Sequence, residues 1–343
     1  MPEISQLTPD SITDAVLEQM AATPDPRLKE IMTAAVEHLH AFARETNLTP
    51  AEWIKGIEFM TQVGRMCTPE RQEFILLSDT VGLSALVNLL HDRTAIEEGT
   101  DTSLLGPFYR ENTPKLERGA QIARKADGPE AALWGRVTDV NGAPLANATV
   151  SVWQTSAHGL YDVQLDGAPV DYRGLFETDA NGNYWLRTML PIGYSIPMDG
   201  PVGALAKAQA RHGMRPAHIH FLVGKPNYRE LITALYLRND PHLHDDTVFG
   251  VSKDLVAEVK ASDPDCPLEG LPSIRFDLRL AREGTADKVA GRVGADPSAI
   301  LKGDGSKPAA PAYSSGPAVA AATVGAGPTK PKKGFFSALF GNG

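Results

Sequence analysis

The sequence predicts an α+β protein, with an all-α helical region first and a β-sandwich or barrel after it. Its 343 residues are 42% hydrophobic and 22% charged, an ordinary globular composition that excludes disorder along the whole chain. Apolar residues follow a helical period up to about residue 95 and a period of two from about residue 131. We therefore expect a helical region at 1–105, a β-domain at 106–283 and a disordered, low-complexity tail at 284–343.

Three local signals predict helix starts in the first region. Ser11-x-x-Asp14 has capping-box spacing, and residues 49–52 (TPAE) add a proline at the first helical turn. Residues 68–70 (TPE) predict a third start, because apolar residues follow them at helical spacing. Nothing in this region requires a chemical role, and it is typical of a small all-α domain.

Alternation and turn signals predict the strands of the second region. Residues 148–153 alternate after Asn141-Gly142, which is a strong hairpin signal, and residues 179–182 (DANG) predict a second turn. The strands expected beside and beyond that second turn lie at residues 174–178, 183–188, 217–224, 231–238 and 273–280. Short strands with frequent Gly/Pro turns favour a sandwich or barrel over a parallel α/β fold.

Charge and composition exclude several classes of protein. The net charge is −9, and residues 1–284 alone carry −13, so nucleic acid is not the expected partner. No apolar run reaches the roughly 20 residues that span a bilayer, and the N-terminus lacks a signal-peptide pattern. Two cysteines build no disulfide framework. We expect a cytoplasmic protein.

The tail after residue 283 is rich in Ala, Gly and Pro and ends in a basic, aromatic stretch at residues 330–340 (KPKKGFFSALF). Such a segment buries too little apolar surface to offset the entropy of ordering it. Its end is consistent with weak docking to a membrane surface or a partner protein. The alternative is a solvated tail without a function.

Three His-x-His pairs are candidates for metal binding. His38 and His40 lie in a helical stretch, where residues two apart do not share a face. His218 and His220 lie in a strand pattern, which points both imidazoles to one spot. Imidazole is a frequent metal ligand, so this pair favours a metal site as much as it favours two polar histidines on an inner face.

The third pair, His242 and His244, lies with Asp245 in an acidic, turn-rich loop. Two histidines and a carboxylate are typical of a divalent cation site, such as the Fe(II) site of an extradiol-type enzyme. A solvated loop is the alternative reading.

Two tyrosines are candidates to complete a site around His218 and His220. Tyr161 and Tyr194 each lie one or two residues after a glycine, which on its own is a weak signal. Two phenolates with two imidazoles prefer a hard trivalent ion, meaning Fe(III) over Fe(II) or Zn(II). A free phenol has a pKa near about 10, so only a strongly Lewis-acidic ion holds it deprotonated at neutral pH.

Three separated motifs resemble those of the intradiol ring-cleavage dioxygenases. Residues 152–164 (VWQTSAHGLYDVQ) and 190–197 (LPIGYSIP) resemble the two tyrosine motifs of that family, and residues 211–221 (RHGMRPAHIHF) resemble its histidine motif. The order and spacing agree, and the resemblance runs from about residue 25 to residue 280. It does not include the tail.

The resemblance implies a mixed-topology β-sandwich that holds one non-haem Fe(III) per subunit, with helices at the N-terminus that form a homodimer interface. Tyr161 and His218 would be equatorial ligands, and Tyr194 and His220 axial ligands. Substrates would be O2 and a small aromatic diol or triol, cleaved between its two hydroxylated carbons. Tyr194 and Arg215 would be catalytic: the phenolate takes a substrate proton, and the guanidinium stabilises negative charge on the ring.

Within the family, residues 74–80 (FILLSDT) and 245–251 (DDTVFGV) look most like hydroxyquinol 1,2-dioxygenases, with chlorocatechol enzymes next. The positions that match the substrate pocket there are Leu76, Asp79, Leu105, Gly106, Pro107, Phe108, Ile196 and Pro197, with Arg215. Asp79 is informative, because a carboxylate in an apolar pocket needs a donor, and the third hydroxyl of hydroxyquinol supplies one. We therefore expect hydroxyquinol as the substrate, with catechol or chlorocatechol as the alternative.

One position departs from the family pattern. Ala234 lies where many members have a polar residue, so a slower reaction or an unusual diol is consistent with the sequence. From another class, a β-sandwich that holds iron without catalysis is a further alternative. Oxygen uptake on a diol separates that binding module from an enzyme.

Overall fold

The computed structural model describes residues 6–68, 71–92, 99–111, 113–165 and 167–283 of the chain. It divides into two compact units, Met1–Gln62 and Val63–Gly343. The expected tail and its docking motif lie outside the described residues. The division of the chain at residues 105 and 283 stays a prediction.

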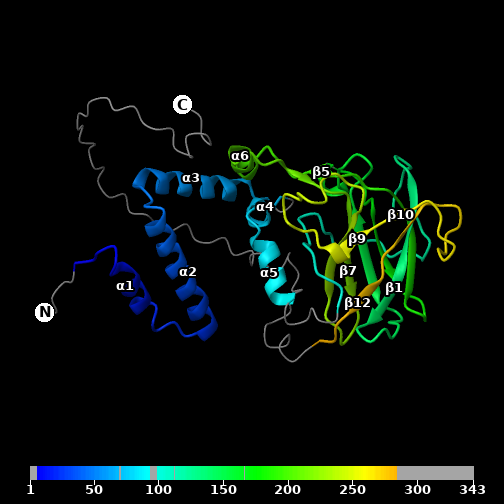
Figure 1. The fold of residues 1–343 in the computed structure, drawn as a ribbon, viewed down its shortest axis with the longest axis horizontal. Coiled ribbons are helices and arrows are strands. Elements are labelled where there is room, and N and C mark those ends of the chain that lie inside the picture. Colours follow the sequence, from blue (N-terminus) through cyan, green and yellow to red (C-terminus); the bar gives the residue numbers. More distant parts are fainter. Residues whose placement is uncertain (1–5, 69–70, 93–98, 112, 166, 284–343) are drawn as a thin grey trace. The chain divides into compact units, whose positions relative to one another are not determined.

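The first unit consists of helices (Figure 1). These are α1 (Ile12–Gln19), α2 (Pro26–Glu45) and most of α3 (Pro50–Met66). The capping box before α3 is confirmed: the Thr49 N–H donates to Glu52 Oε2 at 3.0 Å, and the Glu52 N–H donates to Thr49 Oγ1 at 3.3 Å. Ser11 differs, since its side chain makes no capping bond to α1 and instead accepts from the Thr8 N–H.

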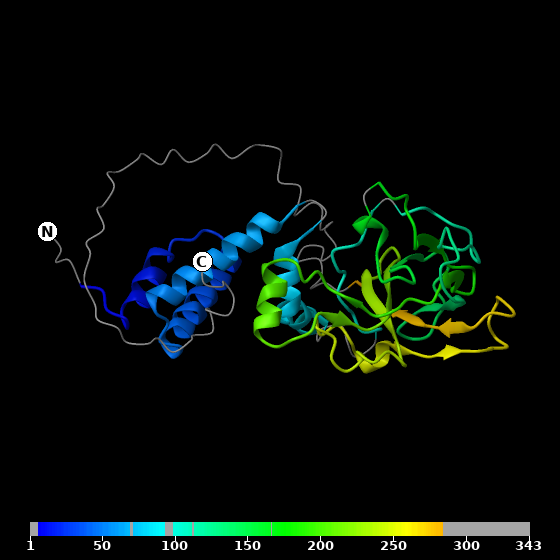
Figure 2. The ribbon, with the colours of Figure 1, turned by 90° about the horizontal axis from the view of Figure 1, so that it is seen from above.

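Three further helices belong to the second unit: α4 (Glu73–Thr80), α5 (Leu83–Asp92) and α6 (Pro201–Ala208). The start expected at residues 68–70 falls partly outside the described residues, and α4 itself begins at Glu73. Gly82 has a φ of +77° and allows the sharp turn between α4 and α5. Helix α6 packs against α4, as Figure 2 shows.

The second unit also contains two five-stranded sheets. The first has the order β10-β11-β1-β12, with β4 also paired to β1, and the second has the order β3-β2-β7-β8-β9. The strands of the first sheet are β1 (Glu130–Asp139), β4 (Asn183–Met189), β10 (Val259–Lys260), β11 (Ser273–Arg275) and β12 (Leu278–Leu280). Those of the second are β2 (Thr149–Gln154), β3 (Arg173–Glu177), β7 (His218–Gly224), β8 (Leu231–Leu237) and β9 (Val256–Ala257).

The sheets form a sandwich of mixed topology. Strand β1 is antiparallel to β4 and parallel to β11 and β12, and β8 is parallel to β9. One hydrophobic cluster contains buried residues of both sheets, including Leu133 and Leu186 from the first and Phe221 and Leu235 from the second. A separate pair, β5 (Tyr194–Ser195) and β6 (Met214–Arg215), forms a two-stranded sheet.

The Asn141-Gly142 turn forms, but it does not make a hairpin between β1 and β2. Gly142 has a φ of +83°, and its N–H donates to the Asp139 oxygen. Both edges of β1 are already occupied, by β4 and by β11 with β12, so β2 joins the other sheet. The turn therefore connects the two layers of the sandwich.

The strand expected at residues 273–280 is interrupted. Strands β11 and β12 pair with successive parts of β1, and Phe276 and Asp277 lie between them. The Asp277 carboxylate accepts from the Arg136 N–H at 3.0 Å, so a side chain takes the place of a backbone oxygen in the ladder. A Cβ on Gly135 would lie 2.0 Å from the Phe276 oxygen, which explains why glycine is needed opposite this bulge.

Among the described residues, no single helix is long and apolar enough to cross a membrane. Helix α4 and residues Leu83–Leu90 of α5 pass the same test only as a pair that is bent by 72°.

Candidate metal and substrate site

Strand β7 brings His218 and His220 to one face, as the alternation predicts. Both are 2% exposed, and their Nε2 atoms lie 3.1 Å apart. The Nδ1 atom of His218 lies 2.7 Å from the Pro216 oxygen, so Nδ1 carries the proton and donates it. The lone pair on Nε2 is thereby directed into the site, an arrangement typical of metal-ligating histidines.

Tyr161 and Tyr194 lie beside the two histidines. The hydroxyl of Tyr161 is 3.4 Å from His218 Nε2. The Tyr194 ring is 5.7 Å from the Tyr161 ring and 5.4 Å from the His218 ring, measured between centroids. The structure therefore gathers in one place the two tyrosines and two histidines that the sequence singled out.

Burial sets the protonation of these groups. It lowers the pKa of His218 and of His220 well below the ordinary histidine range, and the neighbouring charges of Arg215 and His218 act in the same direction. It also raises the pKa of Tyr161 well above the ordinary value of a phenol. Two neutral imidazoles and two phenol oxygens that converge in a dry site fit a strongly Lewis-acidic cation.

A buried ion pair lies directly after Tyr161 in the chain. Asp162 follows Tyr161 in the chain and accepts from Arg173 Nε at 2.9 Å, and both side chains are almost completely buried. Arg173 also donates to the Phe108 oxygen from both terminal nitrogens at 3.1 Å. The Phe108 ring in turn stacks on Tyr161, with 4.4 Å between centroids. Arg173 thus links the backbone after one tyrosine to the aromatic ring that covers it.

Arg215 is buried against the same histidine. Its Nη1 lies 3.3 Å from His218 Nε2, and its other nitrogens contact Asp246 and the Tyr236 hydroxyl. Burial is the largest single effect and would lower the pKa of this guanidinium, but Asp246, Tyr194 and Tyr236 together raise it well above its ordinary value. Arg215 is therefore a permanent positive charge beside the site.

Three of the pocket positions expected from the sequence lie near the tyrosines and histidines, and four others are buried or partly buried. Leu105 and Phe108 belong to a cluster with Trp153, Tyr161 and Tyr194. A Cβ on Gly106 would lie 3.6 Å from the His220 ring. Leu76 and Ile196 are buried, and Pro107 and Pro197 are partly buried.

Asp79 is buried on α4, and burial raises the pKa of its carboxyl group. A hydrogen bond with Ser84 and the charge of Arg215 oppose this rise. The carboxyl group therefore has a partner within the chain, which the sequence argument did not foresee.

Strand pairing shows what faces the histidines from β8. Ala234 is opposite His220, and Tyr236 is opposite His218. Paired residues point to the same face of a sheet, so Ala234 lies where a longer side chain would approach the site. Tyr236 and Asp246 were not recognised from the sequence as site residues. The signal for Tyr236 was its place two residues after Ala234, on the same face of one strand.

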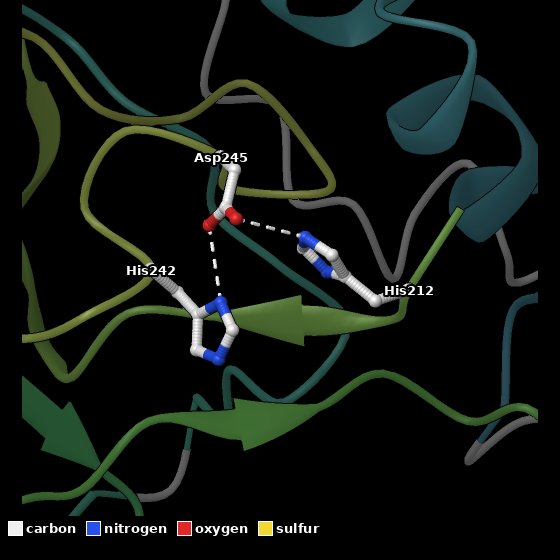
Figure 3. A group of neighbouring side chains, drawn as sticks. All are labelled: His212, His242 and Asp245. Carbon is white, nitrogen blue, oxygen red and sulfur yellow. Dashed lines mark hydrogen bonds and ion pairs between the residues drawn. The ribbon is translucent and has the colours of Figure 1, made fainter. Parts of the chain in front are cut away.

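A second cluster contains His212, His242 and Asp245 (Figure 3). The Asp245 carboxylate lies 3.1 Å from His212 Nε2 and 3.1 Å from His242 Nδ1. The sequence grouped His244 with this loop, but the structure puts His212 in its place. The Met214 N–H donates to His212 Nδ1, so Nε2 carries the proton of the neutral ring and donates to Asp245. This favours a hydrogen-bonded bridge over a metal site.

The first His-x-His pair does not come together. His38 is exposed, and His40 Nδ1 lies 3.0 Å from the Thr13 hydroxyl. This placement is consistent with the expectation that helical residues two apart do not share a metal ion.

Comparison with known proteins defines the class. A family model described as "Dioxygenase" matches residues 104–282, and one described as "Catechol dioxygenase N terminus" matches residues 25–99. The helical region, the sandwich and these matches define a ring-cleaving dioxygenase. The chain belongs to the intradiol ring-cleavage dioxygenase family.

Several relatives are similar over most of their length. A 6-chlorohydroxyquinol 1,2-dioxygenase of Cupriavidus pinatubonensis is 45% identical over 72% of this chain and 90% of the relative. A catechol 1,2-dioxygenase of Candida albicans is 35% identical over 85% of this chain and 99% of the relative. The solved hydroxyquinol 1,2-dioxygenase of Pseudomonas putida is 39% identical, with a TM-score of 0.75 over 80% of this chain and 99% of that one.

Proposed function

We propose that this intradiol dioxygenase cleaves hydroxyquinol (benzene-1,2,4-triol) with O2 between its two adjacent hydroxylated carbons. The product would be 3-hydroxy-cis,cis-muconate, the enol form of maleylacetate. The observation that carries the substrate is the buried carboxyl group of Asp79, because an apolar pocket tolerates it best when a substrate hydroxyl donates to it. The relatives named as hydroxyquinol 1,2-dioxygenases, about 40% identical, support the same substrate.

We propose that Tyr161, Tyr194, His218 and His220 hold one non-haem Fe(III) in each subunit. When bound, this ion supplies Lewis acidity that favours the deprotonated diol and draws electron density from its ring. His218 offers Nε2 because its Nδ1 is bonded to Pro216. Tyr161 gives up its proton only to such an ion, since burial raises its pKa.

The other residues of the site act on the substrate. Tyr194 is proposed to accept one of the two diol protons on its phenolate oxygen. Arg215 holds a fixed positive charge where negative charge develops on the ring, and it needs no reorganisation to do so. Leu105, Phe108 and Ile196 line an apolar wall that excludes water.

Catechol is the second candidate substrate. Asp79 already has a hydrogen-bond partner in Ser84, so a diol without a third hydroxyl does not leave its carboxyl group unpaired. The relative named as a catechol 1,2-dioxygenase is consistent with this alternative.

Oxygen uptake with hydroxyquinol, catechol and 4-chlorocatechol tests the proposal. We expect the highest kcat/KM with hydroxyquinol, and we expect Asp79→Leu to lower the hydroxyquinol-to-catechol ratio of kcat/KM by about tenfold or more. Asp265→Leu, at an exposed aspartate, is the control and should leave the ratio unchanged. A ratio near one that Asp79→Leu does not alter would favour catechol. No uptake with any diol would contradict the proposal.

We also propose a homodimer that forms through the N-terminal helices. Large apolar side chains are exposed on α2 and α3, and burying them against a second copy would remove them from water. They are Leu28, Ile31, Met32, Leu39, Phe42, Trp53, Ile54, Ile57 and Met60. Light scattering should give the mass of two chains, and Phe42→Asp should shift it towards one.

A further inference from the structure

Arg215 and Asp246 form a buried, two-point ion pair. Arg215 is on β6, and Asp246 is in the loop after β8, 31 residues further along the chain. Nε donates to Oδ1 at 3.1 Å, and Nη2 donates to Oδ2 at 3.2 Å. The side chains are 5% and 2% exposed. Two parallel bonds fix the plane of the guanidinium as well as its position.

The carboxylate of Asp246 is itself held by the backbone. Oδ1 accepts from the Val248 N–H at 3.3 Å, and Oδ2 accepts from the Gly250 N–H at 3.0 Å. These bonds use the turn that the loop makes after Asp246. These backbone bonds therefore fix the direction of the Asp246 carboxylate independently of its contact with Arg215.

A chain of hydrogen bonds through Tyr236 and Ser103 also contacts the Arg215 guanidinium. Arg215 Nη2 lies 3.3 Å from the Tyr236 hydroxyl, which lies 2.9 Å from Ser103 Oγ, and Ser103 donates to the Gly250 oxygen at 3.1 Å. Burial raises the pKa of Tyr236 to about 12, so the phenol keeps its proton. A Cβ on Gly250 would lie 2.6 Å from the Tyr236 hydroxyl and 2.9 Å from Arg215 Nη2, which shows how little free space remains.

Only one terminal nitrogen is left to face the proposed reaction site. Nε and Nη2 are used by Asp246 and Tyr236, whereas Nη1 lies 3.3 Å from His218 Nε2. Rotation of the side chain about its bonds would break the pair with Asp246. Asp246 thus determines which nitrogen, and which edge of the guanidinium, faces the metal and the ring.

We infer that Asp246 is the positioning residue for Arg215, with Tyr236 as a secondary support. This inference rests on the proposed function, because it assigns the direction of a charge that the ring-cleavage reaction would use. In the part of the chain that the structure describes, the Asp246 carboxylate bonds to Arg215 and to the backbone after it, and not to the four proposed ligands. Arg215 is the proposed pocket residue that it contacts, so we expect its effect on the reaction to pass through Arg215.

Kinetics and structures of matched variants test this. Asp246→Asn keeps the size of the side chain but turns an amide N–H₂ towards a cation, and Asp245→Asn changes the neighbouring aspartate, which bonds to His212 and His242 instead. We expect Asp246→Asn to lower kcat on the best diol by about a hundredfold with little change in KM. The Asp245→Asn variant should keep the wild-type kcat.

A double-mutant cycle then asks whether Asp246 acts through Arg215. In an Arg215→Lys background, Asp246→Asn should change kcat by less than about threefold, because the group it orients is absent. Full additivity of the two losses would overturn the inference. Tyr236→Phe, which removes one oxygen, provides a milder second variant if Asp246→Asn does not fold, and it should lower kcat with less loss of stability.

Crystal structures give a readout that does not depend on turnover. The Arg215 guanidinium should be displaced in Asp246→Asn and unchanged in Asp245→Asn. A guanidinium that stays in place in Asp246→Asn would overturn the inference even if the enzyme is active. A wild-type chain that cleaves no diol would instead contradict the proposed function, and the crystal structures would still decide whether Asp246 positions Arg215.

Discussion

The Nε2 atoms of His218 and His220 lie 3.1 Å apart, and both side chains are buried. His218 Nε2 presents a lone pair, because its Nδ1 donates to Pro216. Burial keeps both rings neutral by lowering the pKa of each. This geometry supports our proposal that both imidazoles bind one cation, with the Tyr161 oxygen, 3.4 Å from His218 Nε2, as a further proposed ligand.

Loss of one tyrosine should weaken iron binding. Tyr161→Phe removes an oxygen donor but keeps the ring that stacks on Phe108. We expect the iron content of the purified protein to fall well below one per subunit, measured by elemental analysis. Tyr228→Phe is the control, since Tyr228 contacts Arg282 outside the site. Full iron content in Tyr161→Phe would remove Tyr161 from the ligand set.

The Asp162–Arg173 pair should be important for stability. Removing Arg173 leaves the buried Asp162 carboxylate with only a more distant cation, Arg110 at 3.9 Å, so we expect Arg173→Met to lower the free energy of unfolding by about 3–5 kcal/mol in urea titrations. The exposed pair Lys115–Glu177, at 2.7 Å, is the control, and Lys115→Ala should cost less than about 1 kcal/mol. Equal effects of the two substitutions would contradict the role of burial.

Asp79 should decrease stability at neutral pH. Burial raises the pKa of its carboxyl group above the ordinary 3.8, so near and just above that value the folded state binds more protons than the unfolded state. Stability is therefore lost as the pH rises through the raised pKa. We expect Asp79→Asn to raise the Tm at pH 7, with a gain that shrinks as the pH falls towards 4. A gain that is the same at both pH values would contradict this assignment.

The strand-borne part of the site could be predicted from the sequence. Residues two apart in a strand point to the same face of the sheet, so the alternating pattern alone placed His218 and His220 together without knowledge of the fold. The tyrosines were different, because Tyr161 and Tyr194 lie in loops and short segments whose position depends on the whole sandwich. Their assignment needed the resemblance to a family.

The contacts that cross the fold could not be predicted. Asp246 lies in an acidic loop whose sequence predicts exposure to solvent, yet tertiary packing turns its carboxylate inward to Arg215. For the same reason the Asn141-Gly142 signal predicted the turn correctly, but it did not predict that the strands on either side belong to different sheets. Local residues specify the turn, whereas the occupied edges of β1 decide where the next strand goes.

The visible absorption spectrum of the purified, iron-loaded protein tests the central claim most directly. If Tyr161 and Tyr194 bind Fe(III), the protein will be red-brown, with a broad tyrosinate-to-iron charge-transfer band that changes when a diol is added without oxygen. Tyr228→Phe should keep this band. A colourless protein that contains one iron per subunit would contradict the proposed ligand set and the reaction derived from it.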